Sequence, residues 1–167
     1  RMFDIRLTVY NPEQDRPTAK AGATYWDIHQ QVIASMQTLR DDRKSRHERL
    51  LEAEPWDLVI VDEAHHLNVD EATGATLGYQ LVKKLQDHGK IGGLLLFTAT
   101  PHRGKDYGFT ALLELLRPDL FSTEGDLSTQ LTKFPQAVIR NNKQTVTDLQ
   151  GRRLFEAPLV SSEEYAY

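Results

Sequence analysis

The stretch Leu58-Val59-Ile60-Val61-Asp62-Glu63-Ala64-His65 decides the fold expected for this chain. It begins with four consecutive apolar residues, and such runs are typical of parallel-sheet strands that are covered on both faces. The two carboxylates that follow would therefore lie at the carboxyl end of a strand, where α/β sheets bind their ligands. Adjacent carboxylates repel each other, so this position favours a site that shares a cation or a proton.

A second stretch of the same kind is Gly93-Leu94-Leu95-Leu96-Phe97, followed by Thr98-Ala99-Thr100-Pro101. We expect another buried strand that ends in small hydroxyl groups. If the two strands are neighbours, these hydroxyls can reach the carboxylates or His65. Each short motif alone is weak evidence, but two motifs that each follow a buried strand indicate one shared site.

The remaining pattern places this site in an α/β protein. Alternating residues in Phe3–Tyr10 predict a half-buried strand, while Trp26–Arg40 fits either a helix or a short strand followed by a turn. Leu77–Leu85 predicts a helix with Gly89 as its C-cap, and Phe109–Leu116 predicts another helix. Buried strands that alternate with helices predict a layered α/β sheet.

Composition excludes several classes of function. The chain has 167 residues, which fits one domain, and its formal net charge is −4, so any nucleic-acid contact requires a local basic patch. It has no cysteine, which excludes disulfides, thiolate zinc sites and thiol catalysis and fits a reducing cytosol. No apolar run approaches the roughly 20 residues that span a bilayer, so we expect no membrane partner.

Both strand-tip motifs resemble a known family. Leu58–Leu67 and Leu94–His102 are similar to motifs II and III of superfamily-two DEAH helicases and translocases. Val32–Arg40 resembles the motif Ib region of the Swi/Snf-like branch, especially its bacterial forms. Leu112–Phe121 resembles the helix after motif III, and Val138–Lys143 resembles the end of the first RecA-like lobe.

This resemblance implies a fold and a domain assignment. Residues 1–167 are expected to form part of a first RecA-like lobe, from motif Ib to the lobe end, truncated at the N-terminal side. The lobe would be a parallel sheet flanked by helices. For the ambiguous segment, the resemblance implies a short strand over Val32–Ala34 and a helix after Ser35.

One family motif is missing from this sequence. A phosphate-binding loop requires Gly-x-x-x-x-Gly-Lys followed by Ser or Thr. The two Gly-Lys pairs here, Gly89-Lys90 and Gly104-Lys105, are followed by Ile91 and Asp106. We therefore expect that loop, and the second lobe that supplies arginine fingers, elsewhere in a parent protein. The isolated chain is expected to hydrolyse almost no ATP, because the main electrostatic contributors to phosphoryl transfer are absent.

For the parent protein, the resemblance implies an ATP-dependent helicase or translocase that uses Mg²⁺ and moves on nucleic acid, most often duplex DNA. Asp62 would hold Mg²⁺ through water, and Glu63 would be the catalytic base. His65, Thr98 and Thr100 would transmit the nucleotide state. The expected location is the bacterial cytoplasm. The candidate contacts to the nucleic-acid backbone are Ser35, Gln37, Arg40 and Arg103.

Three alternative functions remain open at this point. One is the motor subunit of a restriction system, which shares both strand-tip motifs. Another is a catalytically inactive RecA-like interaction module. The third is a metal hydrolase built on Asp62, Glu63, His65 and His66, although the sequence contains no His-Glu-x-x-His zinc motif.

Simpler interpretations also exist for single residues. Asp62 and Glu63 would be a solvated acidic turn, and Thr98 and Thr100 would merely end a strand, where β-branched residues are common. The basic residues of Asp42–Glu54 are interleaved with acidic ones, which favours a solvated face of a surface helix.

Overall fold

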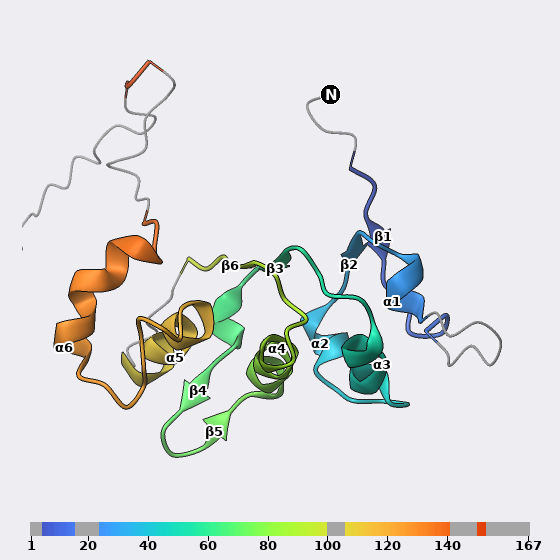
Figure 1. The fold of residues 1–167 in the computed structure, drawn as a ribbon, viewed down its shortest axis with the longest axis horizontal. Helices are drawn as coiled ribbons and strands as arrows, with labels where there is room; N and C mark the ends of the chain where they lie inside the picture. The colour runs from blue at the N-terminus through green and yellow to red at the C-terminus, as the bar shows by residue number, and fades with distance from the viewer. Residues whose placement is uncertain (1–4, 16–23, 100–105, 141–149, 153–167) are drawn as a thin grey trace, which may run out of the picture. The chain divides into compact units, whose positions relative to one another are not determined.

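The computed structural model describes residues 5–15, 24–99, 106–140 and 150–152. The chain divides into two compact units, Arg1–Leu131 and Thr132–Tyr167, and the predicted strand tips both belong to the first unit (Figure 1). In chain order, the elements are β1 (Thr8–Val9), α1 (Tyr25–Ile28), β2 (Val32–Ile33), α2 (Met36–Leu39), α3 (Arg46–Glu52), β3 (Val59–Val61), η1 (Ala64–His66), β4 (Val69–Asp70), β5 (Gly74–Ala75), α4 (Leu77–Asp87), β6 (Leu94–Leu96), α5 (Asp106–Leu116), α6 (Leu127–Gln130) and η2 (Leu131–Gln136).

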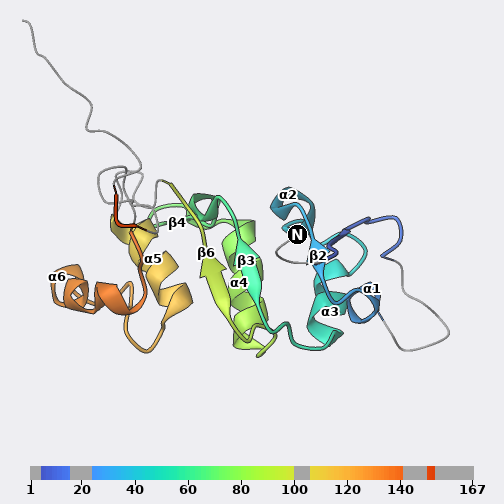
Figure 2. The same ribbon diagram turned by 90° about the horizontal axis from the view of Figure 1, so that it is seen from above.

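The first unit contains two parallel strand pairs, β1 with β2 and β3 with β6. In the second pair Ile60 lies opposite Leu95, so the strands that carry the two motifs are direct neighbours (Figure 2). Parallel strands flanked by helices confirm the predicted α/β class. The implied strand and helix around Ser35 are also confirmed, because β2 precedes Ser35 and α2 begins directly after it. An antiparallel hairpin, β4–β5, was not predicted.

The longest element between the two motifs is the helix α4, and it begins and ends next to residues that are typical helix caps. Thr76 caps its first turn, since the Thr76 hydroxyl accepts a hydrogen bond from the backbone N–H of Tyr79. At the other end, Gly89 has a φ of +66°, and the N–H of Lys90 reaches the carbonyl of Leu85 at 2.8 Å. This is the arrangement in which glycine ends a helix without steric cost, and it confirms Gly89 as the cap.

Two apolar clusters hold the first unit together. The first joins the inward face of β3 to α4 and α5, and the second joins α1, α3 and the other side of α4. Helix α4 therefore contributes to both clusters and connects the two strand pairs. The buried members are Val61, Ala64, Leu67, Tyr79, Val82, Ala111, Leu112 and Leu115 in the first, and Tyr10, Tyr25, Trp26, Leu50, Ala53, Leu81 and Leu85 in the second.

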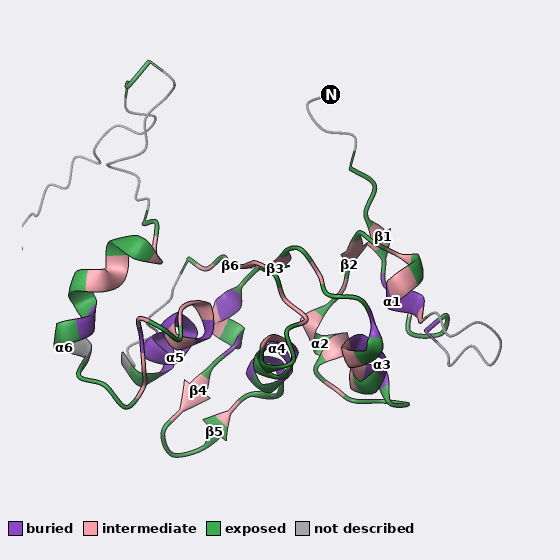
Figure 3. Ribbon diagram, in the orientation of Figure 1, coloured by how far each residue is buried: buried purple, intermediate pink, exposed green. Residues whose placement is uncertain are grey.

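The expectation that β3 and β6 are covered on both faces is wrong for the described structure. Val61 packs inward against α4 and α5, but Ile60 is 56% exposed, and Leu58, Leu95 and Phe97 are exposed on the same face (Figure 3). The physical reason is the placement of the helices, which lie on one side of this pair (Figure 1). Within the described residues, no element covers the other side.

Strand β1 also has one open face, and it is the apolar one. Val9 is 74% exposed, whereas Tyr10 is buried. The Tyr10 ring stacks on Trp26 with centroids 4.6 Å apart, and its hydroxyl donates to Asp15 at 2.6 Å. The strand is therefore shorter than predicted, and its apolar residues lie on the exposed face, because aromatic packing turns Tyr10 toward the core.

Helix α3 was expected to present a solvated basic face, and this is wrong for two of its arginines. Arg46 and Arg49 are buried. Arg49 makes a bidentate ion pair with buried Asp15, at 2.7 and 2.9 Å. Because Asp15 lies 34 residues away in the chain, local charge patterning could not reveal this pairing.

No described helix is long and apolar enough to cross a membrane.

Candidate active site

The carboxyl ends of β3 and β6 are joined beyond the strands themselves. The N–H of Phe97 donates to the carbonyl of Val61 at 2.9 Å, and the N–H of Ala64 donates to the carbonyl of Phe97 at 2.8 Å. These bonds continue the parallel ladder into both loops. The predicted acidic and hydroxyl motifs therefore start from one fixed edge.

Glu63 occupies an unusual backbone conformation at this edge. Its φ is +49°, a left-handed geometry that is uncommon for residues other than glycine, asparagine and aspartate. The carboxylate of Asp62 stabilises the turn, because its Oδ1 accepts the N–H of Glu63 at 2.8 Å. Both acidic side chains remain exposed. Strained backbone of this kind concentrates at functional sites, where the surrounding structure maintains it.

His65 connects the two motifs. Its Nδ1 lies 3.0 Å from Oε2 of Glu63 and 3.4 Å from Oγ1 of Thr98, and its ring is largely buried. The contact with Thr98 is the longer and weaker of the two. The structure thus brings together Glu63, His65 and Thr98, with Asp62 adjacent through the turn.

The Nδ1 atom of His65 makes different hydrogen bonds with and without a proton. When Nδ1 carries a proton, it donates to the Glu63 carboxylate; when it does not, it accepts a hydrogen bond from the Thr98 hydroxyl. One nitrogen cannot do both at once. The contact with the Glu63 carboxylate therefore requires a proton on Nδ1, whereas a hydrogen bond donated by the Thr98 hydroxyl requires an Nδ1 without one.

The donor set at this edge fits a magnesium ion. Mg²⁺ prefers one or two carboxylates together with water and substrate phosphates. Asp62 uses Oδ1 for the turn, and its carboxylate is exposed to solvent. A closed metal cage is not formed here, because no group of three or more His, Cys, Asp or Glu side chains in the described ranges can hold an ion. This counts against the metal-hydrolase alternative.

Other predicted residues lie elsewhere. Ser35, Gln37 and Arg40 are exposed on and around α2, and no contact in the described part of the chain joins them to Asp62 or Glu63. They form a separate candidate surface. Thr100 and Arg103 fall outside the described residues.

Sequence analysis missed one positioning residue. The hydroxyl of Thr76 donates to the carbonyl of His66 at 3.2 Å, and the N–H of Thr76 donates to the carbonyl of Asn68 at 2.9 Å. These bonds hold the loop after the acidic motif against the start of α4. The signal was present, because a threonine directly before a helical stripe is a typical N-cap.

Comparison with known families agrees with this geometry. A model described as the SNF2-related domain matches residues 3–153. The chain belongs to the SNF2-related family. Its relatives include the RNA polymerase-associated protein RapA of Yersinia pseudotuberculosis, 34% identical over 134 residues, which are 80% of this chain and 13% of the relative. RapA of Yersinia pestis is 33% identical over the same shares.

Membership in the SNF2-related family confirms the Swi/Snf-like resemblance seen in the two motifs. The match includes β3, β6 and both loops that follow them. The chain spans only 13% of the length of these curated relatives. These comparisons therefore establish the family of this segment and not the activity of a whole protein that contains it.

Proposed function

We propose that this chain is part of the first RecA-like lobe of an ATP-dependent DNA helicase or translocase, in which Mg-ATP hydrolysis drives movement on duplex DNA. The observation that supports this most directly is the contact of His65 with both Glu63 and Thr98 across neighbouring strand tips. A motor must couple hydrolysis to motion, and this contact joins an acidic motif to a second strand.

In the proposed reaction, Glu63 is the general base. Its exposed carboxylate accepts the proton of the water that attacks the terminal phosphoryl group, and its left-handed backbone points it from a rigid edge. The Nδ1 atom of His65 contacts both Glu63 and Thr98. A change in the charge of Glu63 therefore alters the hydrogen bond between His65 and Thr98. Thr98 and Thr100 pass this change to the loop after β6.

Asp62 is the residue that would hold Mg²⁺, through water, when ATP is bound. The ion supplies neutralisation of the phosphate charge. The sequence contains no phosphate-binding loop, and we propose that other parts of a parent protein, including a second lobe, supply the remaining phosphate contacts. We accordingly propose that the isolated chain is inactive.

Ser35, Gln37, Arg40 and Arg103 are the proposed contacts to the nucleic-acid backbone. The first three are exposed around α2, which packs on α4 through Met36 and leaves its polar side free. Polar and basic side chains of this kind contact phosphates without reading sequence.

The test is ATP hydrolysis by the full-length protein with and without linear duplex DNA. We expect strong stimulation by the duplex, together with displacement of a third strand bound ahead of the motor. Hydrolysis without displacement would reduce the proposal to a DNA-dependent ATPase. Absence of any ATP hydrolysis would instead favour the inactive interaction module.

The names of the relatives suggest a biological setting. Both are called RNA polymerase-associated proteins. We extend the proposal to association of the parent protein with RNA polymerase in the bacterial cytoplasm. Co-purification of polymerase subunits with the tagged full-length protein at physiological salt tests this, and recovery of restriction or modification subunits would favour the restriction-system alternative.

A further inference from the structure

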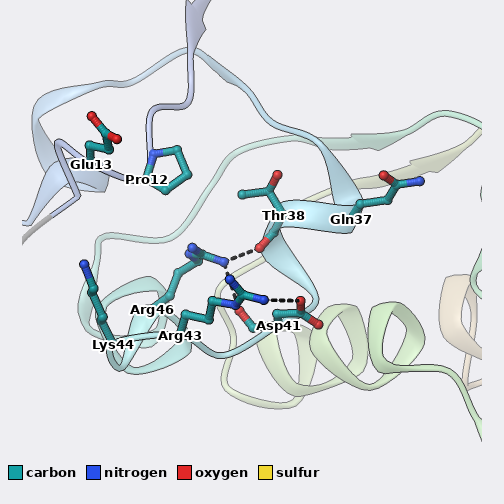
Figure 4. A pocket seen from close by; sticks show the side chains of 8 residues that line it. All are labelled: Pro12, Glu13, Gln37, Thr38, Asp41, Arg43, Lys44 and Arg46. Atoms are coloured by element: carbon teal, nitrogen blue, oxygen red, sulfur yellow. Dashed lines mark hydrogen bonds and ion pairs between the residues drawn. The ribbon is translucent and has the colours of Figure 1, made fainter.

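A pocket of about 590 Å³ lies away from the strand tips, between the loop after β1 and the segment from α2 to α3 (Figure 4). We call it the Lys44 pocket. The residues that bear charge in its lining are Glu13, Asp41, Arg43, Lys44 and Arg46. Three cations therefore face two carboxylates in a chain whose net charge is −4, which makes this a local basic site on an acidic protein.

Arg46 forms the fixed part of this charge. It is 5% exposed, and one of its terminal nitrogens donates to the backbone carbonyls of Thr38 and Asp41 (Figure 4). Within the described residues, its Nε has no hydrogen-bond partner, and no carboxylate lies within ion-pair distance of it. The nearby carboxylate of Asp15 is already paired with Arg49. The positive charge of Arg46 is therefore held in place and not neutralised by a paired carboxylate.

Lys44 is presented at the rim by a strained backbone. Lys44 and Ser45 have φ values of +55° and +54°, two successive left-handed residues without glycine. Such positions persist only where the surrounding structure maintains them, and here the guanidinium of Arg49 donates to the carbonyl of Lys44. In the described part of the chain, the Lys44 ammonium makes no ion pair or hydrogen bond.

Arg43 completes the rim with a charge that is easily redirected. Its guanidinium lies 3.8 Å from Asp41; the Arg43 side chain is 78% exposed and the Asp41 side chain is 41% exposed. Exposed pairs of this length contribute little to stability, so a stronger anion can replace Asp41 as the partner of Arg43 at small cost.

We propose that the Lys44 pocket binds one backbone phosphate of the duplex DNA on which the parent protein moves, an inference that rests on the proposed function. Lys44 and Arg43 contact the phosphate, and Arg46 supplies fixed charge beneath them. The surplus of one positive charge matches the single charge of a phosphodiester. The pocket also continues the candidate DNA surface, because Gln37 and Thr38 of α2 line one wall.

The experiment measures the dissociation constant of the full-length protein for duplex DNA at several salt concentrations. The test variant is Lys44→Asn with Arg43→Gln, since asparagine tolerates the left-handed backbone at position 44. The control is Lys83→Gln, which removes an exposed lysine of α4 that pairs with Asp87 on the same helix. Equal thermal unfolding of all three proteins verifies that each is folded.

We expect the double variant to bind roughly three- to tenfold more weakly, with a salt-dependence slope smaller by about 1. The loss should be the same on unrelated DNA sequences, because phosphate contacts do not read bases. Lys83→Gln should retain the original slope. A double variant whose slope equals that of the unmodified protein overturns the proposal.

Free inorganic phosphate is a second anion with the same chemistry as a backbone phosphate. Its binding to each protein is measured by calorimetric titration. If the double variant loses phosphate binding while its DNA slope is unchanged, the pocket takes free phosphate and the DNA assignment is wrong. DNA binding is measured without ATP, so a parent protein that fails to hydrolyse ATP would defeat the proposed motor while leaving this result readable.

Discussion

The strand tip and the contact between the loop after β1 and α3 hold their charges in opposite ways. Asp62 and Glu63 are exposed, and a backbone turn rather than a cation positions them. Asp15 is 1% exposed and is paired bidentately with Arg49, and its Oδ2, which accepts from Arg49, also accepts from the Tyr10 hydroxyl. All three acidic residues look alike in the sequence, but among them only Asp15 is buried and paired with an arginine.

This difference separates residues that we propose to bind ligands from residues that hold the fold. A buried carboxylate that lost its partner would be costly, so Asp15 and Arg49 stabilise the loop on α3. Exposed carboxylates at the end of a strand remain accessible to an ion or a water molecule from solvent. The comparison predicts that variants at the two places will fail in different measurements.

The largest effect is expected at the strand tip. Glu63→Gln in the full-length protein should lower ATP hydrolysis by roughly 10²- to 10⁴-fold, the usual contribution of a general base. ATP binding, measured by displacement of a fluorescent analogue, should persist because the amide keeps the shape of the side chain. The control is Glu71→Gln in the exposed β4–β5 turn, and unimpaired hydrolysis in Glu63→Gln would reject the role of Glu63.

The next effect concerns stability and not activity. Arg49→Met leaves Asp15 buried without its partner and should cost about 3–5 kcal/mol of local stability, seen as faster hydrogen exchange of the amides in α3. The matched control is Arg117→Met, because Arg117 makes the same bidentate contact with Asp119 in solvent. Similar exchange in the two variants would show that burial is not what distinguishes these pairs.

A smaller effect is expected where the two motifs meet. Thr98→Val keeps the shape of the side chain but removes the hydroxyl that lies 3.4 Å from His65. Loss of a weak neutral hydrogen bond, about 1 kcal/mol, should reduce the ratio of DNA-stimulated to unstimulated hydrolysis by about fivefold. Thr73→Val in the exposed hairpin is the control. A ratio that is unchanged in Thr98→Val would argue against coupling through His65.

Near neutral pH, the smallest effect on stability is expected from a change in pH. Burial raises the pKa of Asp15, but hydrogen bonds from Arg49 and Tyr10, together with the charges of Arg49 and Arg46, outweigh burial and leave that pKa below its ordinary value. Its stabilisation is therefore complete above the ordinary carboxyl pKa and is lost as the pH falls through the lowered folded value. Urea midpoints of the unmodified protein and Asp15→Asn should converge toward acid. A constant difference down to pH 2 would contradict this sign.

Several elements follow directly from local sequence. The periodic stripe of α4, its threonine cap and its glycine end predict that helix accurately, because all three signals act within a few residues. The two strand-tip motifs and their order also predict that β3 and β6 are neighbours. By contrast, Trp26–Arg40 could not be assigned from periodicity, since a two-residue strand and a four-residue helix are both too short to establish a period.

What the sequence by itself determined is the order of the elements and the chemistry available at the strand tips, because propensity, capping and hydrophobic pattern are local. Only the tertiary structure decided which face of each strand is covered, that Arg46 and Arg49 are buried, and that a single nitrogen of His65 serves both motifs. These features depend on contacts between residues as far apart as Asp15 and Arg49. Such contacts leave no trace in a short window of sequence.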